Sequence, residues 1–270
     1  MTGRLIKLLL SAILGAYDAL IRPLGGPRPG CCVVINYHSI FEETRSRFSK
    51  QLDLLPYLAT PIPAGKEFVF EKKQRYVAIT VDDVFCSFVL NGLPELCKRD
   101  MPATLFPPTG FFGKKSSWDD HGGENKVGEE VVSTDELKRI AKLSNVDFGS
   151  HGVTHSDFAR LPEEAARREL QESKKSLETI IGREITAVSF PYGSHGSREL
   201  RLAGEAGYKF YFDSTPQQIF SAMNGGLIGR VDVQPTDWDI EFRLKVCGAY
   251  RWVRRASALK KKLRSICWFR

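Results

Sequence analysis

Short apolar segments and amphipathic helical segments alternate along most of this chain, and the alternation limits the folds that it can adopt. The apolar segments are rich in β-branched residues, and the helical ones carry apolar residues at three- and four-residue spacing. This order predicts parallel strands joined by helices, in a barrel or an open sheet. Seven strands are predicted, at residues 31–37, 76–82, 103–106, 146–150, 185–190, 208–212 and 227–233. Five helices are predicted between them, at 45–58, 87–99, 134–143, 162–181 and 197–206.

The 270 residues suit one α/β barrel with additions at both ends. We expect an apolar helix and a linker at 1–30, the barrel at 31–240 and a basic helical tail at 241–270. The apolar run near the N-terminus contains Lys7 and Asp18, and its uninterrupted part is too short to cross a bilayer. It predicts an interfacial helix first, a helix docked on the protein's own body second, and a signal segment third.

Positive charge is concentrated at the C-terminal end of the chain. The net charge is +7, but without the ten basic residues that follow Glu241 the acidic residues slightly outnumber the basic ones. Because aromatic residues are interleaved with these cations, the tail predicts peripheral contact with an anionic membrane, with a solvated helix as the alternative. No nucleic acid partner is expected, since no recognition motif accompanies the charge. The ten residues are Arg243, Lys245, Arg251, Arg254, Arg255, Lys260, Lys261, Lys262, Arg264 and Arg270.

The six cysteines bear on the cellular compartment. None of them forms a CxxC pair, and several lie in apolar runs, which is typical of buried free thiols. Free thiols favour a reducing environment. The predicted location is therefore the cytoplasm or the cytoplasmic face of a membrane, with secretion left open.

Five residues with chemically useful side chains or positions fall at or just after predicted strand ends: His38, Asp82, Asp83, His151 and Tyr192. In parallel α/β folds this edge carries the functional site. His151 is expected to share one face of a helical turn with a histidine four residues later, so that both rings reach one ion. A carboxylate completes a three-ligand site for a divalent metal, which activates water, and the second carboxylate can act as the base.

Each of these signals also has a simpler interpretation. A pair of aspartates is often a solvated turn, and two histidines at this spacing often lie on a surface helix. His38 is equally compatible with a structural role and with an active-site role. His121 and His195 lie in predicted loops and are expected to be solvated. Trp118 belongs to a long polar segment, where it offers either a sugar-stacking platform or core packing.

Three motifs, in this order, resemble those of the polysaccharide deacetylases of carbohydrate esterase family 4, the NodB-homology family. They read Thr80-Val81-Asp82-Asp83-Val84, Ser150-His151-Gly152-Val153-Thr154-His155 and Ser189-Phe190-Pro191-Tyr192-Gly193. Two shorter stretches are similar to one branch of the family. They read Tyr37-His38 and Gly229-Arg230-Val231. The resemblance covers roughly residues 31–235.

The resemblance implies a distorted (β/α)7 barrel and a metal-dependent hydrolase. Its substrate would be an N-acetylated sugar of a polysaccharide or a lipid-linked glycan, from which it removes acetyl groups. It implies that Asp83, His151 and His155 hold one divalent metal, usually zinc. It also implies that Asp82 is the general base and that the backbone N–H of Tyr192 stabilises the oxyanion.

The substrate-binding residues are expected to be Pro191, in the third motif, and Trp118.

The sequence also departs from the family at three places. Val84 stands where the family has glycine, and a β-branched residue is expected to resist a positive φ there. No arginine precedes Pro191 at the usual place, so we expect the base to lack its orienting partner.

The family's late histidine, which serves as general acid, has no counterpart around residues 227–229. His38 is therefore the candidate for that role. A catalytically impaired, glycan-binding pseudoenzyme on the same fold is the alternative function, and a membrane-associated scaffold is a third.

Overall fold

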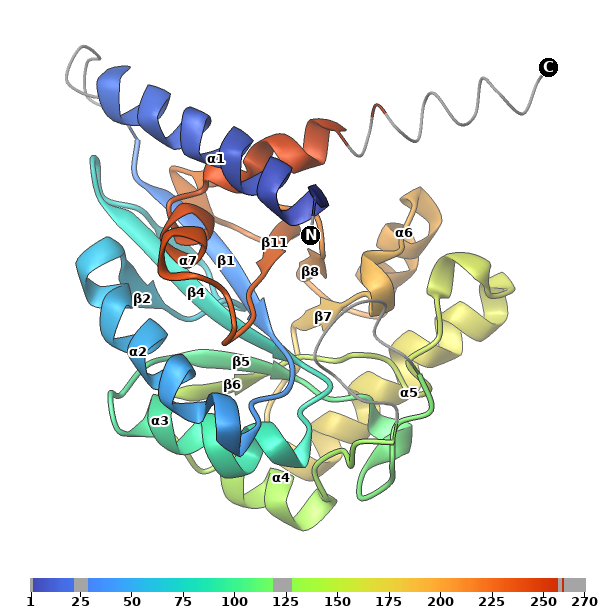
Figure 1. Ribbon diagram of the computed structural model, residues 1–270. Helices are drawn as coiled ribbons and strands as arrows, with labels where there is room; N and C mark the ends of the chain where they lie inside the picture. Colours follow the sequence, from blue (N-terminus) through green and yellow to red (C-terminus); the bar gives the residue numbers. More distant parts are fainter. Residues whose placement is uncertain (1, 22–28, 119–127, 257–258, 260–270) are drawn as a thin grey trace.

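A computed structural model describes residues 2–21, 29–118, 128–256 and 259 (Figure 1). Seven parallel strands form the central sheet path in the order β6-β5-β4-β1-β11-β8-β7. Backbone hydrogen bonds from Ser150 to Ala187 and from Ser189 to Ser150 join the two ends of this path. The predicted (β/α)7 barrel is confirmed. Its strands are β1 (Cys31–Tyr37), β4 (Arg75–Asp82), β5 (Ala103–Phe106), β6 (Val146–Phe148), β7 (Ala187–Ser189), β8 (Phe210–Asp213) and β11 (Gly226–Asp232).

The two central strands explain why the apolar segments form a barrel. Every residue of β1 is buried, as are all residues of β4 after Arg75. They pair in parallel over their whole length, with Val33 opposite Val77 and Ile35 opposite Ile79. A parallel strand that is covered on both faces favours a continuous run of β-branched residues, which is the pattern of both segments.

Helices cover the outside of the barrel, as predicted (Figure 1). They are α2 (Glu42–Leu58), α3 (Leu93–Cys97), α4 (Thr134–Ile140), α5 (Glu163–Ile181) and α6 (Ser197–Glu205). The helix predicted at 87–99 is divided into a π-helical turn, η1 (Phe88–Gly92), and α3. Helix α4 is capped by the side chain of Ser133, which accepts a hydrogen bond from the backbone N–H of Glu136.

Four short strands were not predicted from the sequence: β2 (Thr60–Ile62), β3 (Phe68–Val69), β9 (Ile219–Phe220) and β10 (Ala222–Met223). Helix α7 (Asp239–Val246) lies at the start of the tail that was expected to be helical, but it begins before residue 241, so the boundary expected at 240/241 falls inside it. Phe242, Val246 and Tyr250 belong to the buried core. The first part of the expected tail is therefore part of the barrel's own packing.

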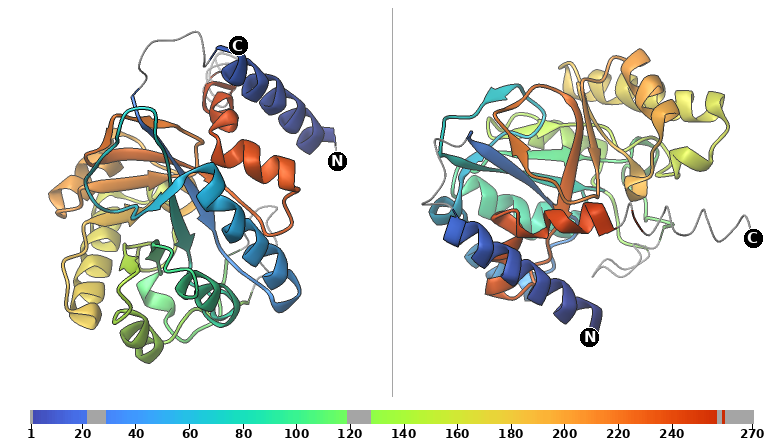
Figure 2. Two further views of the ribbon diagram at one scale, coloured as in Figure 1. Left: turned by 90° about the vertical axis from the view of Figure 1, so that its left-hand side faces the viewer. Right: turned by 90° about the horizontal axis from the view of Figure 1, so that it is seen from above.

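The N-terminal run forms a helix, α1 (Thr2–Ile21), which packs on α7 and on the short turn η5 (Ala249–Arg251). Figure 2 shows α1 on the outside of the barrel, beside the C-terminal helical segment. The interpretation as a helix docked on the protein's own body is thus correct for one face of α1. In the described part of the chain, no helix has the length and apolar character that crossing a membrane requires.

Candidate active site

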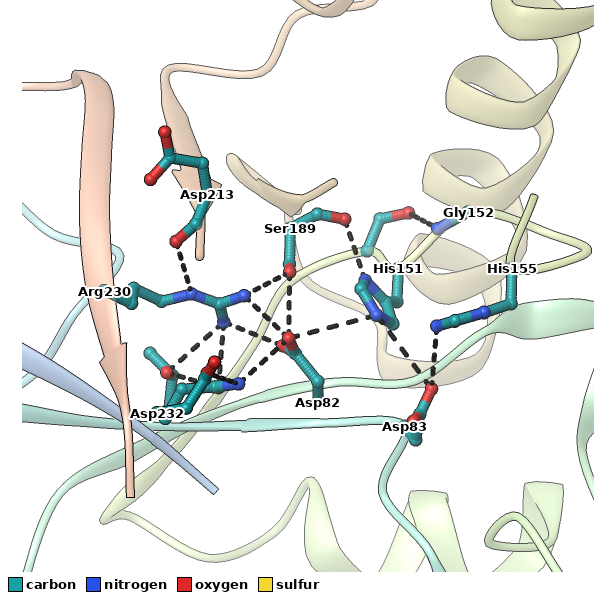
Figure 3. A network of polar contacts seen from close by, with 12 residues as sticks. Asp82, Asp83, His151, Gly152, His155, Ser189, Asp213, Arg230 and Asp232 are labelled. Atoms are coloured by element: carbon teal, nitrogen blue, oxygen red, sulfur yellow. Dashed lines mark hydrogen bonds and ion pairs between the residues drawn. The ribbon is translucent and has the colours of Figure 1, made fainter. Parts of the chain in front are cut away.

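Three potential metal ligands converge at the carboxyl ends of β4 and β6, which are separated in the sheet by β5 (Figure 3). Asp83 directly follows β4, and His151 and His155 follow β6. Their ligand atoms all lie within 4.8 Å of one another. Oδ1 of Asp83 is 3.4 Å from Nε2 of His155 and 3.9 Å from Nε2 of His151. Ligands about 2.1 Å from a tetrahedral ion lie roughly 3.4 Å apart, so this donor set fits a divalent metal such as zinc.

The hydrogen bonds of His151 determine which ring nitrogen faces the other ligands. Its Nδ1 lies 2.8 Å from the carbonyl oxygen of Ser189, which can only accept, so Nδ1–H donates and Nε2 keeps its lone pair. Burial lowers the pKa of both histidines, and that of His155 falls to about 2. Both rings are therefore neutral at neutral pH, the form in which imidazole binds a metal.

The predicted helical turn between the two histidines is wrong, because residues 151–155 form a loop. Gly152 and His155 both have positive φ, at 78° and 56°, which no helix contains. The loop is held by Glu169 of α5, whose carboxylate accepts hydrogen bonds from the backbone N–H of Val153 (2.7 Å) and of Thr154 (2.9 Å). The carboxylate of Glu169 thus replaces the hydrogen bonds that a helix would have supplied, and the ring centroids of His151 and His155 lie 4.8 Å apart.

The candidate base, Asp82, forms a bidentate ion pair with Arg230 of β11. The two nitrogen–oxygen distances are 2.8 and 2.6 Å, and both side chains are buried (Figure 3). Burial has the largest single effect and by itself would raise the pKa of Asp82, but the charge and hydrogen bonds of Arg230, with contributions from His151 and His38, together lower the pKa below its ordinary value. Asp82 is therefore ionised, and its Oδ2 lies 3.9 Å from Nε2 of His151.

Arg230 corrects the expectation that the base lacks an orienting partner. Its guanidinium also donates to Oδ1 of Asn36 (2.9 Å), to Oγ of Ser189 (2.8 Å) and to the backbone oxygen of Asp213 (3.3 Å). It is the largest fully buried side chain among the described residues. Analysis of the sequence missed its role, although a charged residue between Ile228 and Val231 in an apolar strand is a signal of a buried ion pair.

The backbone after β4 points the two aspartates in different directions. Asp83 and Val84 both have positive φ, at 63° and 52°, and the N–H of Val84 donates to the carbonyl oxygen of Asp82 (2.7 Å). The expectation that valine would resist this conformation is wrong. Val84 is fully buried in the core, and its packing offsets the backbone cost. As a result Asp82 faces Arg230 and Asp83 faces the histidines (Figure 3).

Trp118 contacts two of the three candidate ligands, His155 and Asp83, and is only 9% exposed. Its ring stacks on His155 with centroids 4.1 Å apart and meets Phe111 edge-on at 4.7 Å. Its Nε1 donates to Oδ2 of Asp83 at 3.3 Å. This placement does not fit the expected sugar-stacking platform, because the ring is covered; Trp118 instead orients two of the ligands.

The structure places the other predicted site residues around the same strand ends. Tyr192 has positive φ (59°), its side chain is exposed, and its ring lies edge-on 4.9 Å from the ring of His155. Pro191 is buried and begins the same turn, η4 (Pro191–Gly193). His38 follows β1 and is half-buried, and its charge acts on Asp82.

His195 is not the solvated loop residue that the sequence predicted. Its ring stacks on Phe190 with centroids 5.3 Å apart, and its Nε2 lies 3.9 Å from Oδ2 of Asp213. His121 lies outside the described residues.

Replacing His155 with alanine should abolish stoichiometric metal binding. The remaining donors are one imidazole and one carboxylate, so the loss should exceed the roughly 10–100-fold that removal of an outer-shell partner costs. Elemental analysis after dialysis against trace zinc measures it. His195→Ala is the matched control, since His195 lies outside the ligand set, and it should bind one ion. Full occupancy of His155→Ala would disprove the ligand assignment.

Comparison with known proteins agrees with this geometry. A sequence model of the polysaccharide deacetylase family matches residues 71–211. The poly-β-1,6-N-acetyl-D-glucosamine N-deacetylase of Staphylococcus aureus is 26% identical over 206 residues, which are 71% of this chain and 67% of that protein.

Two solved structures share the fold. Streptococcus pyogenes deacetylase PplD, in complex with acetate, superposes with a TM-score of 0.65 at 19% identity, over 81% of this chain and 99% of that one. IcaB from Ammonifex degensii gives 0.64 at 20% identity, over 83% and 98%. The family match spans more than half of the chain and contains all three motifs with the candidate base and metal ligands. The chain therefore belongs to the polysaccharide deacetylase family, which confirms the predicted class of enzyme, a deacetylase-like hydrolase of amide bonds.

Proposed function

We propose that this protein is a metal-dependent deacetylase that hydrolyses the acetamide group of N-acetylated sugars in a polysaccharide or a lipid-linked glycan. The observation that carries the proposal is the position of the Asp82 carboxylate. It is held ionised by Arg230 and lies 3.9 Å from Nε2 of His151, a member of the candidate ligand set. A base and a metal site at this separation suit the attack of one water molecule on an amide. The S. aureus relative, named for poly-N-acetylglucosamine, supports a glucosamine polymer as the substrate class.

The roles of the residues follow from their chemistry. Asp83, His151 and His155 would hold the divalent cation, with zinc as the proposed metal. When bound, this ion supplies a Lewis acid that polarises the acetyl carbonyl and acidifies water. Asp82 accepts the proton of the attacking water, since it is ionised and Arg230 fixes its orientation.

Two further groups complete the proposed reaction. The backbone N–H of Tyr192, in a turn with positive φ, donates to the oxyanion that develops on the carbonyl oxygen. Pro191 shapes that turn. The leaving amine needs a proton, and His38 is the proposed donor because it follows β1, at the same end of the barrel as the candidate ligands.

The test is acetate release from a panel of N-acetylated and O-acetylated oligosaccharides. We expect release from N-acetylated glucosamine oligomers, loss of release after chelation, and recovery when zinc is restored. His38→Gln should lower turnover about 10²–10⁴-fold, the usual contribution of a positioned acid, and should remove the basic limb of the pH profile. His195→Gln, at the same end of the barrel, is the control. Unchanged turnover in His38→Gln would mean that another group is the general acid.

The alternative is a catalytically impaired protein on the same fold that binds acetylated glycans. It is favoured by Val84 in place of glycine and by the missing late histidine. Glycan binding with no acetate release at any metal loading would support this alternative against the deacetylase.

Location is part of the proposal as well. We place the protein in the cytoplasm or at the cytoplasmic face of a membrane, with peripheral contact to anionic lipid. The basic C-terminal residues, predicted to make that contact, are partly engaged within the protein: Lys245 is 2.7 Å from Asp237, and Arg251 is 2.8 Å from Asp18. Electrostatic attraction between the tail alone and anionic lipid is therefore weaker than the sequence suggested.

A further inference from the structure

Helix α1 turns its most apolar face away from the barrel. Seven large apolar side chains along the helix are exposed, among them Leu9 at 63% and Leu20 at 74%. They recur at spacings of three or four residues, in two adjoining rows, and so form one continuous stripe. A surface helix ordinarily packs such a stripe against the core. The members of the α1 stripe are Leu5, Ile6, Leu9, Leu10, Ile13, Tyr17 and Leu20.

The opposite face of α1 is docked through small residues. Ser11 is fully buried, and Gly15 lies so close to the body that an added Cβ would come within 2.9 Å of a side-chain carbon of Leu244. Glycine and serine permit this close approach, but they bury little apolar surface. The apolar surface of the helix is therefore directed outward, and its packing on the barrel does not account for it.

Polar contacts along α1 fix its rotation, so the outward direction of the stripe is built into the fold. Near its start, Arg4 forms an ion pair with the buried Glu241 (2.6 Å) and lies over the ring of Trp238. Near its end, Asp18 accepts two hydrogen bonds from Arg251, both of 2.8 Å. Between them Trp252 donates to Ser11 at 2.9 Å. Turning the stripe inward would break all of these contacts.

The charge around the α1 stripe indicates what kind of surface covers it. Helix α1 and the adjoining segment 249–256 contain one acidic residue, Asp18, which is already paired, against five basic ones. Of these, Arg4, Lys7 and Arg255 are exposed, and Arg4 is paired with Glu241. A second copy docked on the stripe would bring these like charges face to face, whereas anionic headgroups would attract them. The five basic residues are Arg4, Lys7, Arg251, Arg254 and Arg255.

We propose that α1 is a membrane-docking element that lies in the plane of an anionic lipid surface and inserts the α1 stripe between the headgroups. The polar contacts, including those of Arg4 and Arg251, hold the barrel to the helix, and the exposed Lys7 and Arg255 meet the headgroups. This inference goes beyond the proposed deacetylation and does not depend on it. Helices of this kind bury their apolar face at the boundary of headgroups and acyl chains, without crossing the bilayer.

The test is co-sedimentation of the full chain with phosphatidylcholine vesicles and with vesicles that also contain phosphatidylglycerol. Wild-type protein should sediment with the anionic vesicles and more weakly with the neutral ones. The double variant Leu9→Glu/Ile13→Glu should bind the anionic vesicles at least about tenfold more weakly, because two inserted side chains become charged. Both side chains are more than half exposed, so the melting temperature should not change.

Leu90→Glu is the matched control. Leu90 is 67% exposed on η1, outside the α1 stripe, and this variant should bind as wild type does. The proposal is overturned if the double variant binds like wild type, if wild type ignores both kinds of vesicle, or if Leu90→Glu loses binding equally. It is also overturned if sedimentation without lipid shows a dimer that Leu9→Glu/Ile13→Glu dissociates. Acetate release measured on a soluble oligomer should be the same in all variants, which separates this test from that of the proposed function.

Discussion

Asp82→Asn should lower turnover by about 10²–10⁴-fold while the protein keeps its fold and its metal. The amide of asparagine cannot accept a proton from water, whereas the wild-type carboxylate is ionised and oriented by two hydrogen bonds from Arg230. The measurement is acetate release at saturating substrate, together with elemental analysis of the same sample. Because Arg230 keeps the pKa of Asp82 below its ordinary value, protonation of Asp82 should not limit the wild-type rate until the pH falls below about 4.

Asp232→Asn is the control for this variant. Asp232 ends β11, and its carboxylate also accepts a hydrogen bond from Asn36, at 3.5 Å. It has no assigned role in the reaction, so the control should retain turnover within about tenfold of wild type. Wild-type turnover in Asp82→Asn would move the base to another residue. Loss of metal in Asp82→Asn would instead show that this side chain is a ligand.

Arg230→Met should destabilise the protein by about 3–5 kcal/mol, because it leaves the buried carboxylate of Asp82 without its cation. Urea denaturation of metal-free protein measures the free energy of unfolding. In wild type the pKa of Asp82 is depressed, so its contribution to stability is present above the ordinary pKa and is lost as the pH falls through the lowered value. In the variant, burial without the cation raises this pKa, so protonation restores stability. The difference between the two proteins should therefore narrow at acidic pH.

A second substitution identifies the cause of this loss. Arg230→Met/Asp82→Leu removes both charges and should recover most of the stability, while acetate release stays absent. Arg230→Lys keeps the charge but not the two-pronged geometry, so it should fall between wild type and Arg230→Met. A free energy of unfolding for Arg230→Met within about 0.5 kcal/mol of wild type would contradict the structural role of the ion pair.

The seven strands and their parallel order could be predicted because each depends on local sequence. A continuous apolar, β-branched run such as residues 31–37 suits a strand that is covered on both sides, wherever its neighbours lie. The short pairings of β2, β3, β9 and β10 could not be predicted in this way. They have two or three residues each, which is too short for a hydrophobic period to develop, and the partners of β3, β9 and β10 are distant in the chain.

The candidate base and the candidate metal ligands were also visible in the sequence. Asp82 and Asp83 end one predicted strand and His151 follows another, and parallel strands bring such ends to one edge of a barrel. The local conformation of the site was not predictable. The loop that holds His151 and His155 depends on Glu169 of α5, and the positive φ of Val84 depends on burial in the core.

The sequence by itself therefore determined the barrel and indicated the candidate metal ligands and the candidate base, through residue type, strand position and the three motifs. Only the tertiary structure decided what surrounds them. Arg230 meets Asp82 across 148 residues of chain, Trp118 is covered by His155, and the outward face of α1 is set by ion pairs with the far end of the protein. Each of these depends on which distant groups become neighbours when the barrel closes, and neither local periodicity nor a motif contains that information.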